Sequence, residues 1–407
     1  MNCRHCQEPL RLVMADLGCA PPSNSYLFPD SDRALEKTYP LRVLVCQKCW
    51  LAQTEDFVDR EECFSANYAY FSSCSASWVE HAGRYASDMA ERLSLGKDSL
   101  VAEIASNDGY LLRHFQAAGI PCYGVEPTEN TAAVARDAGL DIVPEFFGTA
   151  LAEKLLAERG PVDLLAANNV LAHVPDINDF AKGAALLVGP NGTATFEFPH
   201  LLQLLEQNYF DTIYHEHFSY LSLGAVVRIF RTAGLAVVDV EELPTHGGSL
   251  RVHARQAGSG ASVSPRVTEF IAGEQKAGLE DASVYSAFQP RISRLADTFV
   301  AFLRETCGRG AMIAGYGAAA KGNTFLNFAR IDGDLIKFVV DRSPGKAGKL
   351  LPGSRIPVRR EDHLLAEKPD VIVILPWNLR DEIARQLAYT RDWGARFAVA
   401  LPELEVF

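Results

Sequence analysis

The sequence predicts an α/β protein of three parts: a small zinc-binding module, a doubly wound α/β domain and a second, smaller α/β domain. Two pairs of cysteines near the amino end indicate the first part. Alternating strand and helix patterns begin near residue 99 and again near residue 310, which indicates the other two. We therefore expect the parts to span residues 1–65, 66–258 and 259–407.

Composition limits the classes of function. The chain has 407 residues, a formal net charge of −12 and 48% hydrophobic residues. An acidic chain has no general attraction for a phosphate backbone or an anionic membrane. The sequence shows no apolar run of about 18 residues and no signal-peptide pattern. We therefore expect a cytoplasmic protein without a nucleic-acid or membrane partner and, because no coiled-coil pattern is present, a monomer.

The paired cysteines predict a metal site. Cys3 and Cys6 are separated by two residues, as are Cys46 and Cys49. This spacing lets one turn direct both thiolates at one ion, and two such turns supply the four sulfurs of a tetrahedral zinc site. Because four sulfurs leave no open position, we expect the zinc to be structural. Two alternatives stay open: cysteine pairs that are buried or redox-active without metal, and His5 in place of one sulfur.

The segment from residue 99 to 127 predicts a strand, a turn, a helix and a second strand. Ligands of open α/β sheets bind at the carboxyl ends of such strands. Glu126 follows Gly109 by 17 residues, near the spacing of an acidic residue that binds ribose hydroxyls. The turn has one glycine where a dinucleotide fingerprint has three, which favours S-adenosylmethionine over NAD. We expect the cofactor to contact Ser106, Asn107, Asp108, Gly109 and Glu126.

The carboxyl ends of the strands carry further candidate residues for the cofactor pocket. Asn107 and Asp108 could contact the amino-acid portion of the cofactor or merely cap the helix. Further strands near 162–168 and 191–200 complete a doubly wound sheet. Asn168, Asn169 and His173 follow the first of these strands, so we expect them in the cofactor pocket.

The densest cluster of ionisable residues lies at 210–223, where Tyr214, His215, Glu216 and His217 are adjacent. A neutral imidazole can accept a proton near pH 7, and a neighbouring carboxylate can orient it, so the cluster predicts a general base. A polar surface strand and a metal site through His215 and His217 stay open as alternatives. Upstream, the aromatic and hydroxyl residues of 67–82 either lead into a helix or fold over the cofactor as a lid.

The last part begins after a polar stretch at 257–265 and a helical segment at 266–306. Residues 310–328 predict a strand, a Gly-x-Gly turn and a helix. Small residues there let backbone N–H groups approach a phosphate, although a plain strand-to-helix turn is an equal alternative. We expect a nucleotide-sized partner, with Gly317, Lys321, Asn323 and Asp341 as candidate binding residues.

Taken together, these motifs resemble a known family over essentially the whole chain. They are the cysteine pairs, NYAYFSSCSASW, EIASNDGYLL, GVEPTEN, FDTIYHEHFSYLS, GGSLRV and GYGAAAKGNTFLNF. The family is that of the S-adenosylmethionine-dependent nucleotide-sugar C-methyltransferases that act on 4-keto deoxysugars. The resemblance implies a zinc-binding module, a Rossmann-like methyltransferase domain and a Rossmann-like carboxyl-terminal domain that helps hold the nucleotide sugar.

The resemblance also implies roles. The histidine matching His217 is the base that removes a proton beside the keto group, and Tyr214, Glu216 and Tyr68 line the same site. The implied product carries the methyl on C-3 of a dTDP-linked 4-keto-6-deoxy sugar, with C-5 methylation and a GDP-linked sugar as alternatives. The residues alone leave two other interpretations: an NAD-dependent nucleotide-sugar oxidoreductase or epimerase, and a non-enzymatic protein whose zinc module recruits a partner or nucleic acid.

Overall fold

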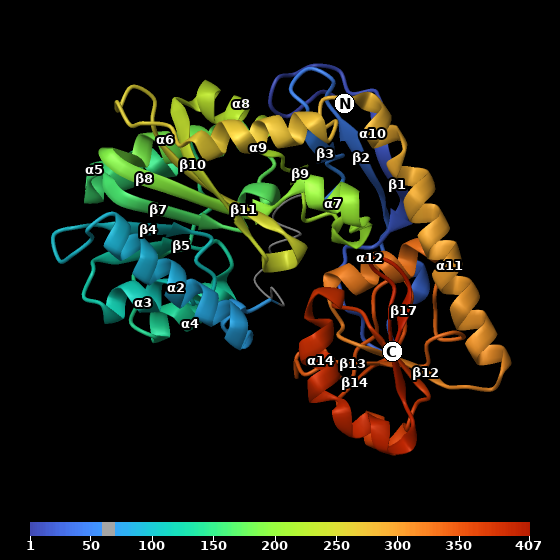
Figure 1. Ribbon diagram of the computed structural model, residues 1–407. Coiled ribbons are helices and arrows are strands. Elements are labelled where there is room, and N and C mark those ends of the chain that lie inside the picture. Colours follow the sequence, from blue (N-terminus) through green and yellow to red (C-terminus); the bar gives the residue numbers. More distant parts are fainter. Residues whose placement is uncertain (59–69) are drawn as a thin grey trace.

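The computed structural model describes residues 1–58 and 70–407, and shows three α/β parts in contact. Figure 1 shows the amino-terminal sheet against both the middle domain and the carboxyl-terminal domain, with the long helix α11 running from the first to the last. Among the described residues, no helix is both long and apolar enough to cross a bilayer. The predicted fold class, a zinc-binding module followed by two Rossmann-like α/β domains, is confirmed.

The amino-terminal module is an antiparallel sheet whose second cysteine pair lies in a turn. The order is β1-β2-β3-β9, and the turn with Cys46 and Cys49 joins β2 to β3. The fourth strand comes from the middle of the chain, directly after the predicted base cluster. The strands are β1 (Leu12–Ala20), β2 (Tyr39–Val45), β3 (Ala52–Thr54) and β9 (Ser219–Tyr220).

The middle domain is a seven-stranded sheet in the order β10-β11-β8-β7-β4-β5-β6. The five strands from β8 to β6 are parallel, and β11 and β10 extend the sheet in antiparallel fashion. The strands are β4 (Val101–Ile104), β5 (Cys122–Val125), β6 (Ile142–Val143), β7 (Val162–Asn168), β8 (Val188–Pro199), β10 (Leu235–Leu243) and β11 (Ser249–Gln256).

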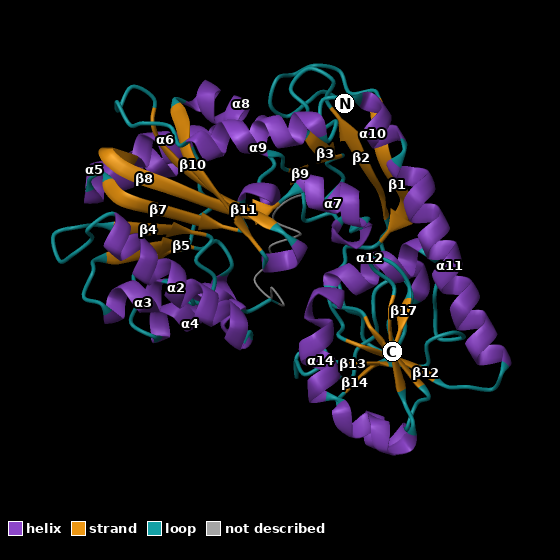
Figure 2. Ribbon diagram, viewed as in Figure 1, coloured by secondary structure: helices purple, strands orange, loops and turns teal. Residues whose placement is uncertain are grey.

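Helices cover both faces of this sheet, as Figure 2 shows. Leu164 and Ala166 of β7 pack beneath α2 and α3, whereas Leu165 and Ala167 pack on the opposite side. A central strand buried on both faces must be apolar throughout, which is why β7 reads as a continuous apolar run. The helices within residues 66–258 are α2 (Ala76–Arg92), α3 (Leu112–Ala117), α4 (Glu129–Asp137), α5 (Thr149–Arg159), α6 (Ile177–Leu187), α8 (Leu223–Ala233) and α7 (Leu201–Gln207), and α7 packs instead in the core of the amino- and carboxyl-terminal parts.

The carboxyl-terminal domain is a six-stranded sheet in the order β14-β13-β12-β15-β16-β17, reached through three helices. All its strands are parallel except β17, which pairs antiparallel with β16. The connecting helices are α9 (Pro265–Lys276), α10 (Ala282–Ser286) and α11 (Phe288–Gly308). The domain contains β12 (Ile313–Tyr316), α12 (Ala320–Phe328), β13 (Val339–Val340), β14 (Val358–Arg359), α13 (His363–Glu367), β15 (Val371–Ile374), α14 (Arg380–Gln386), β16 (Arg396–Val399) and β17 (Glu405–Val406).

Hydrophobic cores cross the sequence boundaries between the parts. One core joins Met14 and Val43 of the amino-terminal sheet to Phe299 of α11 and to the strands of the carboxyl-terminal domain. Cys3, Cys46 and Cys49 belong instead to the core of the middle domain, and Cys6 packs against it. The divisions at 1–65, 66–258 and 259–407 stay a prediction about the sequence, whereas in space the amino-terminal module packs against both domains.

Candidate active site

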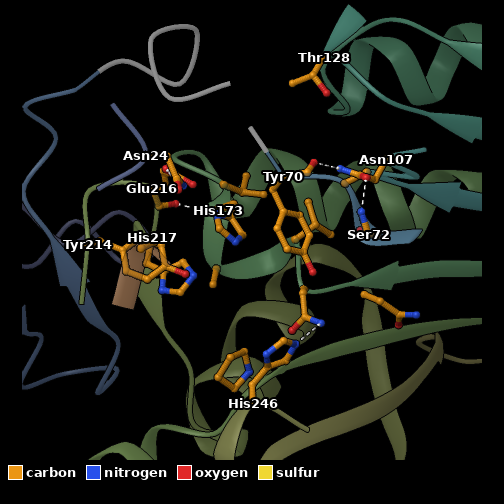
Figure 3. A pocket seen from close by; sticks show the side chains of 18 of the residues that line it. Asn24, Tyr70, Ser72, Asn107, Thr128, His173, Tyr214, Glu216, His217 and His246 are labelled. Atoms are coloured by element: carbon orange, nitrogen blue, oxygen red, sulfur yellow. Dashed lines mark hydrogen bonds between the residues drawn. The ribbon is translucent and has the colours of Figure 1, made fainter. Parts of the chain in front are cut away.

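A cavity of about 440 Å³ lies where the three parts meet. Figure 3 shows the side chains that converge on it from segments far apart in the sequence. Tyr68 lies in 59–69, outside the described residues. The polar lining includes Asn24 from the first part, Asn107, Glu126, Thr128, Asn168, Asn169, His173, Tyr214, Glu216, His217 and His246 from the second, and Lys321, Lys346 and Asn378 from the third.

The turn after β4 and the end of β5 form one wall. Asn107 has a left-handed backbone (φ 49°), and its N–H donates to Oε2 of Glu126 at 2.8 Å. Oε1 of Glu126 accepts the N–H of Thr128 at 2.9 Å. These bonds hold the carboxylate at the edge of the cavity, while burial raises the pKa of Glu126 above its usual value. The acid is therefore placed where it can accept hydrogen bonds from ligand hydroxyls.

Three other residues predicted to contact the cofactor lie behind this wall. Ser106 is fully buried beside Gly124 of β5. Asp108 accepts hydrogen bonds from the N–H and hydroxyl of Ser73, at 3.1 and 2.5 Å. Gly109 (φ 76°) packs so closely that an added Cβ would lie 2.1 Å from Leu140. These three residues therefore stabilise the turn and do not line the cavity.

The segment before α2 closes over this turn. The Oδ1 of Asn107 accepts the N–H of Ser72 at 2.9 Å, and its Nδ2 donates to the carbonyl of Tyr70 at 3.2 Å. Tyr70, Ser72 and Trp78 line the cavity. Of the segment 67–82, residues 70–75 contact the turn after β4 and lead into α2, whereas a lid over the cofactor stays a prediction.

Asn168, Asn169 and His173 lie on the next wall, at the end of β7. The amide oxygens of both asparagines are buried, and neither has a hydrogen-bond partner among the described residues. His173 donates Nδ1–H to the carbonyl of Glu216 at 2.9 Å. Burial lowers the pKa of His173 to about 4, so its imidazole is neutral at physiological pH.

The predicted base cluster faces the same cavity. His217 donates Nδ1–H to the carbonyl of Thr212 at 2.8 Å, which leaves the lone pair on Nε2. Its ring lies 4.0 Å from that of Tyr214 and 4.6 Å from that of His173. Burial lowers the pKa of His217 well below its usual value, and the positive charge of Lys321 lowers it further. The site therefore keeps His217 neutral and able to accept a proton.

His215 points elsewhere. Its Nε2 donates to the carbonyl of Pro40 at 3.2 Å, and its ring contacts Tyr39 edge-on at 6.0 Å. Among the described residues, the four paired cysteines are the cluster able to hold a metal ion. In the base cluster, His215, Glu216 and His217 are buried, so the segment is not a surface strand. Both alternatives, a metal site at His215 and His217 and a surface strand, therefore lack support.

The carboxyl-terminal domain contributes two lysines to the cavity. Nζ of Lys321 donates to Oδ1 of Asn378 at 3.2 Å and lies 4.7 Å above the Trp377 ring, and burial lowers its pKa. Nζ of Lys346 donates to the carbonyl of Ala318 at 2.7 Å. The small residues Ala319 and Ala320, at the start of α12, also line the cavity.

The other three candidate substrate residues lie outside the lining. Gly317 (φ 89°) packs against Pro376, whose Cγ would lie 2.4 Å from an added Cβ. Asp341 accepts the N–H of Ala318 at 2.8 Å and that of Ser343 at 2.7 Å. Asn323 donates Nδ2–H to the carbonyl of Ser23 at 2.6 Å. They hold the loops around the cavity.

The four paired cysteines converge. Their Sγ atoms all lie within 4.8 Å of one another, with Cys3 3.5 Å from Cys49 and Cys6 3.5 Å from Cys46. Four sulfurs about 2.3 Å from a central zinc ion would be spaced by about 3.8 Å, so the set fits a tetrahedral site. Nδ1 of His5 instead pairs with Oδ1 of Asn178 at 2.7 Å.

Comparison with known proteins identifies the family. Family models match in order: a proposed zinc binding domain over residues 3–64, a methyltransferase domain over 78–240 and a C-methyltransferase C-terminal domain over 244–402. The C-methyltransferase NovU of Streptomyces niveus is 35% identical over 405 residues, which cover 100% of this chain and 96% of NovU. The chain belongs to the C-methyltransferase family. Membership favours methyl transfer to carbon over the oxidoreductase and non-enzymatic interpretations.

Other similarities of this C-methyltransferase cover less than half of the chain. A ubiquinone biosynthesis O-methyltransferase of Bordetella avium is 28% identical over 98 residues, 24% of this chain and 41% of that protein. The solved structure of PH0226 from Pyrococcus horikoshii matches with a TM-score of 0.38 and 14% identity, covering 46% of this chain and 95% of that one. An S-adenosylmethionine-dependent methyltransferase from Clostridium acetobutylicum matches with a TM-score of 0.35 and 9% identity, covering 44% and 92%.

Two buried amide oxygens without a hydrogen-bond partner among the described residues indicate that the cavity of this C-methyltransferase fits its cofactor. A buried amide oxygen without a donor costs about 1–3 kcal/mol, so the two oxygens of Asn168 and Asn169 call for donors from a ligand. The ammonium group of S-adenosylmethionine carries such donors, and Glu126 offers acceptors for ribose hydroxyls at the same edge.

Sequence reasoning missed several lining residues. His246 lies between two domains with a left-handed backbone (φ 56°), and its Nε2 lies 3.4 Å from Nδ2 of Asn169. It stands just before two glycines in the GGSLRV motif, and such strained positions concentrate at functional sites. That motif was the available signal. Asn24 and Lys346, on loops of other parts, had none.

Proposed function

We propose that this C-methyltransferase transfers the methyl group of S-adenosylmethionine to C-3 of a dTDP-linked 4-keto-6-deoxy sugar, with His217 as the base. One observation carries the proposal: the hydrogen bond from His217 Nδ1 to Thr212 leaves Nε2 as a proton acceptor in a buried cavity. That cavity lies between the predicted cofactor edge and a domain bearing two lysines.

The proposed chemistry begins on the sugar. His217 removes the proton from the carbon beside the keto group, and the ketone delocalises the resulting negative charge as an enolate. Lys321 lines the same cavity as His217, so its positive charge favours the enolate electrostatically. When bound, S-adenosylmethionine would supply an electrophilic methyl group: the S–CH3 bond would break as the new C–C bond forms, with the neutral thioether S-adenosylhomocysteine as the leaving group.

Lys321 and Lys346 are suited to the diphosphate of the substrate. Both ammonium groups line the cavity, and both donate to neutral oxygen atoms, while Lys346 also lies 3.7 Å from Oδ2 of Asp341. The first turn of α12 adds backbone N–H groups at the same place. The proposal therefore assigns the nucleotide diphosphate to the carboxyl-terminal domain and the keto sugar to the region around His217.

The test is mass spectrometry of a dTDP-4-keto-6-deoxyglucose substrate incubated with enzyme and S-adenosylmethionine in deuterated buffer. We expect the sugar to gain one methyl group, and to exchange one proton for deuterium when the cofactor is omitted. Methylation at C-5 would show the alternative position. Neither methylation nor exchange, with cofactor binding still seen by calorimetry, would contradict this substrate class.

Glu126→Gln is expected to weaken binding of S-adenosylmethionine by about 10-fold or more. A hydrogen bond to a charged group contributes about 1.5–3 kcal/mol, and the amide loses one of two acceptor oxygens while keeping the volume. Titration calorimetry measures the change. Glu129→Gln is the matched control, because Glu129 is a nearby glutamate at the exposed start of α4. Equal affinity in the two variants would exclude Glu126 from the cofactor site.

A further inference from the structure

A loop of the amino-terminal module reaches into the catalytic site. Asn24 donates Nδ2–H to Oε1 of Glu216 at 2.6 Å, and Glu216 is only 3% exposed. Figure 3 shows Asn24 beside Glu216, close to His173. Among the described residues that line the cavity, Asn24 is the one contributed by residues 1–58. The module thus contacts a residue of the base cluster directly.

This loop is anchored from the opposite side by the carboxyl-terminal domain. The carbonyl of Ser23 accepts a hydrogen bond from Asn323 at 2.6 Å, and the hydroxyl of Tyr26 donates to the carbonyl of Ala318 at 2.5 Å. Two prolines, at 21 and 22, precede it and restrict its backbone. Asn24 is therefore held before any substrate arrives, which is the condition for a side chain to orient another.

The same module holds the backbone on the other side of His217. Oγ1 of Thr54 donates to the carbonyl of His217 at 2.9 Å, and the N–H of Thr54 donates to that of Phe218 at 3.1 Å. Strand β3 then pairs with β9, which follows immediately. Because the turn carrying Cys46 and Cys49 leads into β3, the metal-binding end of the module is continuous with the support of the base.

We propose that Asn24 is a positioning residue for methyl transfer and that the amino-terminal module is a working part of the catalytic site. Asn24 sets the orientation of the Glu216 carboxylate, and Thr54 sets the backbone of His217. This inference rests on the proposed function of His217 and Glu216. Small misplacements of catalytic groups cost large factors in rate, so the contribution appears in kcat rather than in cofactor affinity.

The experiment compares Asn24→Ala, Asn24→Asp and Ser25→Ala in the full-length, zinc-loaded enzyme. Ser25 is the control because it is the exposed neighbour in the same loop. We expect kcat to fall about 10-fold in Asn24→Ala and further in Asn24→Asp, which faces the Glu216 carboxylate with a second one. The cofactor Kd and zinc content should stay unchanged. Wild-type kcat in both Asn24 variants would overturn the proposal.

A double-mutant cycle separates positioning from a general structural role. If Asn24 acts through Glu216, Asn24→Ala should cost almost nothing further in a Glu216→Gln background, whereas independent losses would multiply and overturn the proposal.

A readout without substrate keeps this inference distinct from the proposed function. If the wild type transfers no methyl to the sugar, the proposed function fails. Hydrogen exchange of residues 214–220 still tests the positioning. It should be several-fold faster in Asn24→Ala and Thr54→Val than in Ser25→Ala, and equal protection in all three would overturn it.

Discussion

Replacing His217 with asparagine is expected to lower kcat by about 10³-fold, equivalent to about 4 kcal/mol, while S-adenosylmethionine still binds. The asparagine amide can still donate to the carbonyl of Thr212, so the local backbone keeps its partner. What is lost is the lone pair of Nε2, the group that would take the proton from the sugar. Single-turnover assays measure the methyl-transfer rate, and calorimetry measures cofactor binding.

His215→Asn is the matched control. It makes the same substitution two residues away, but His215 faces Tyr39 and Pro40 instead of the cavity. We expect its kcat to stay within a few-fold of the wild type. A loss as large as that of His217→Asn would mean that the cluster acts through stability rather than through proton transfer, and full activity of His217→Asn would exclude His217 as the base.

The pH dependence tests the same assignment with the sign fixed by burial. A base works in its neutral form, and burial lowers the pKa of His217, so kcat/KM should hold constant as pH falls to 6.5 and decline only below it. Asp211 also titrates nearby, because burial raises its pKa to about 6. An acid limb that disappears in Asp211→Asn belongs to that residue. A limb above pH 6.5 would contradict a buried neutral His217.

The fold could be predicted from the sequence because the patterns that indicate it are local. Paired cysteines, the apolar run of β7 and the turn at 105–109 each act within a few residues, and the strands form where the pattern predicts them. Strand β9 escaped prediction because two residues cannot show a period, and its partner β3 lies over 160 residues away. Long-range pairing of so short a strand is set by tertiary packing alone.

For the candidate site, the sequence predicted which edge of the sheet carries the polar residues, but not the direction in which each side chain points. Glu126 and Asp108 are both carboxylates near the ends of strands, yet Glu126 lines the cavity and Asp108 bonds Ser73 instead. Asp341 likewise accepts backbone N–H groups, from Ser343 in its own loop and from Ala318 in the loop after β12. Short acidic side chains satisfy nearby backbone donors as readily as ligands, so residue type and position could not distinguish the two outcomes.

Substituting both Cys46 and Cys49 with serine is expected to abolish zinc binding and to unfold the amino-terminal module. Structural zinc contributes about 10–16 kcal/mol of apparent binding free energy in small domains, far more than two thiols could contribute by packing. The wild type should contain one zinc per chain by elemental analysis and the variant less than a tenth of that. Cys19→Ser, an exposed cysteine outside the cluster, should keep both zinc and stability.

Loss of zinc should also lower methyl transfer, although the zinc site lies outside the cavity. Its sheet shares a core with α11 and the carboxyl-terminal domain, and its strand β3 supports the backbone that follows His217. Methyl transfer should therefore fall together with zinc content when a chelator is titrated, and return when zinc is restored. Either of two results would contradict the zinc site: a double variant that retains zinc, or a chelated enzyme with full activity and an unchanged melting temperature. The cysteines would then be buried or redox-active pairs without metal. Reductant discriminates further, because it reduces the disulfide form of a redox-active pair, whereas a zinc site with four thiolates has no disulfide to reduce.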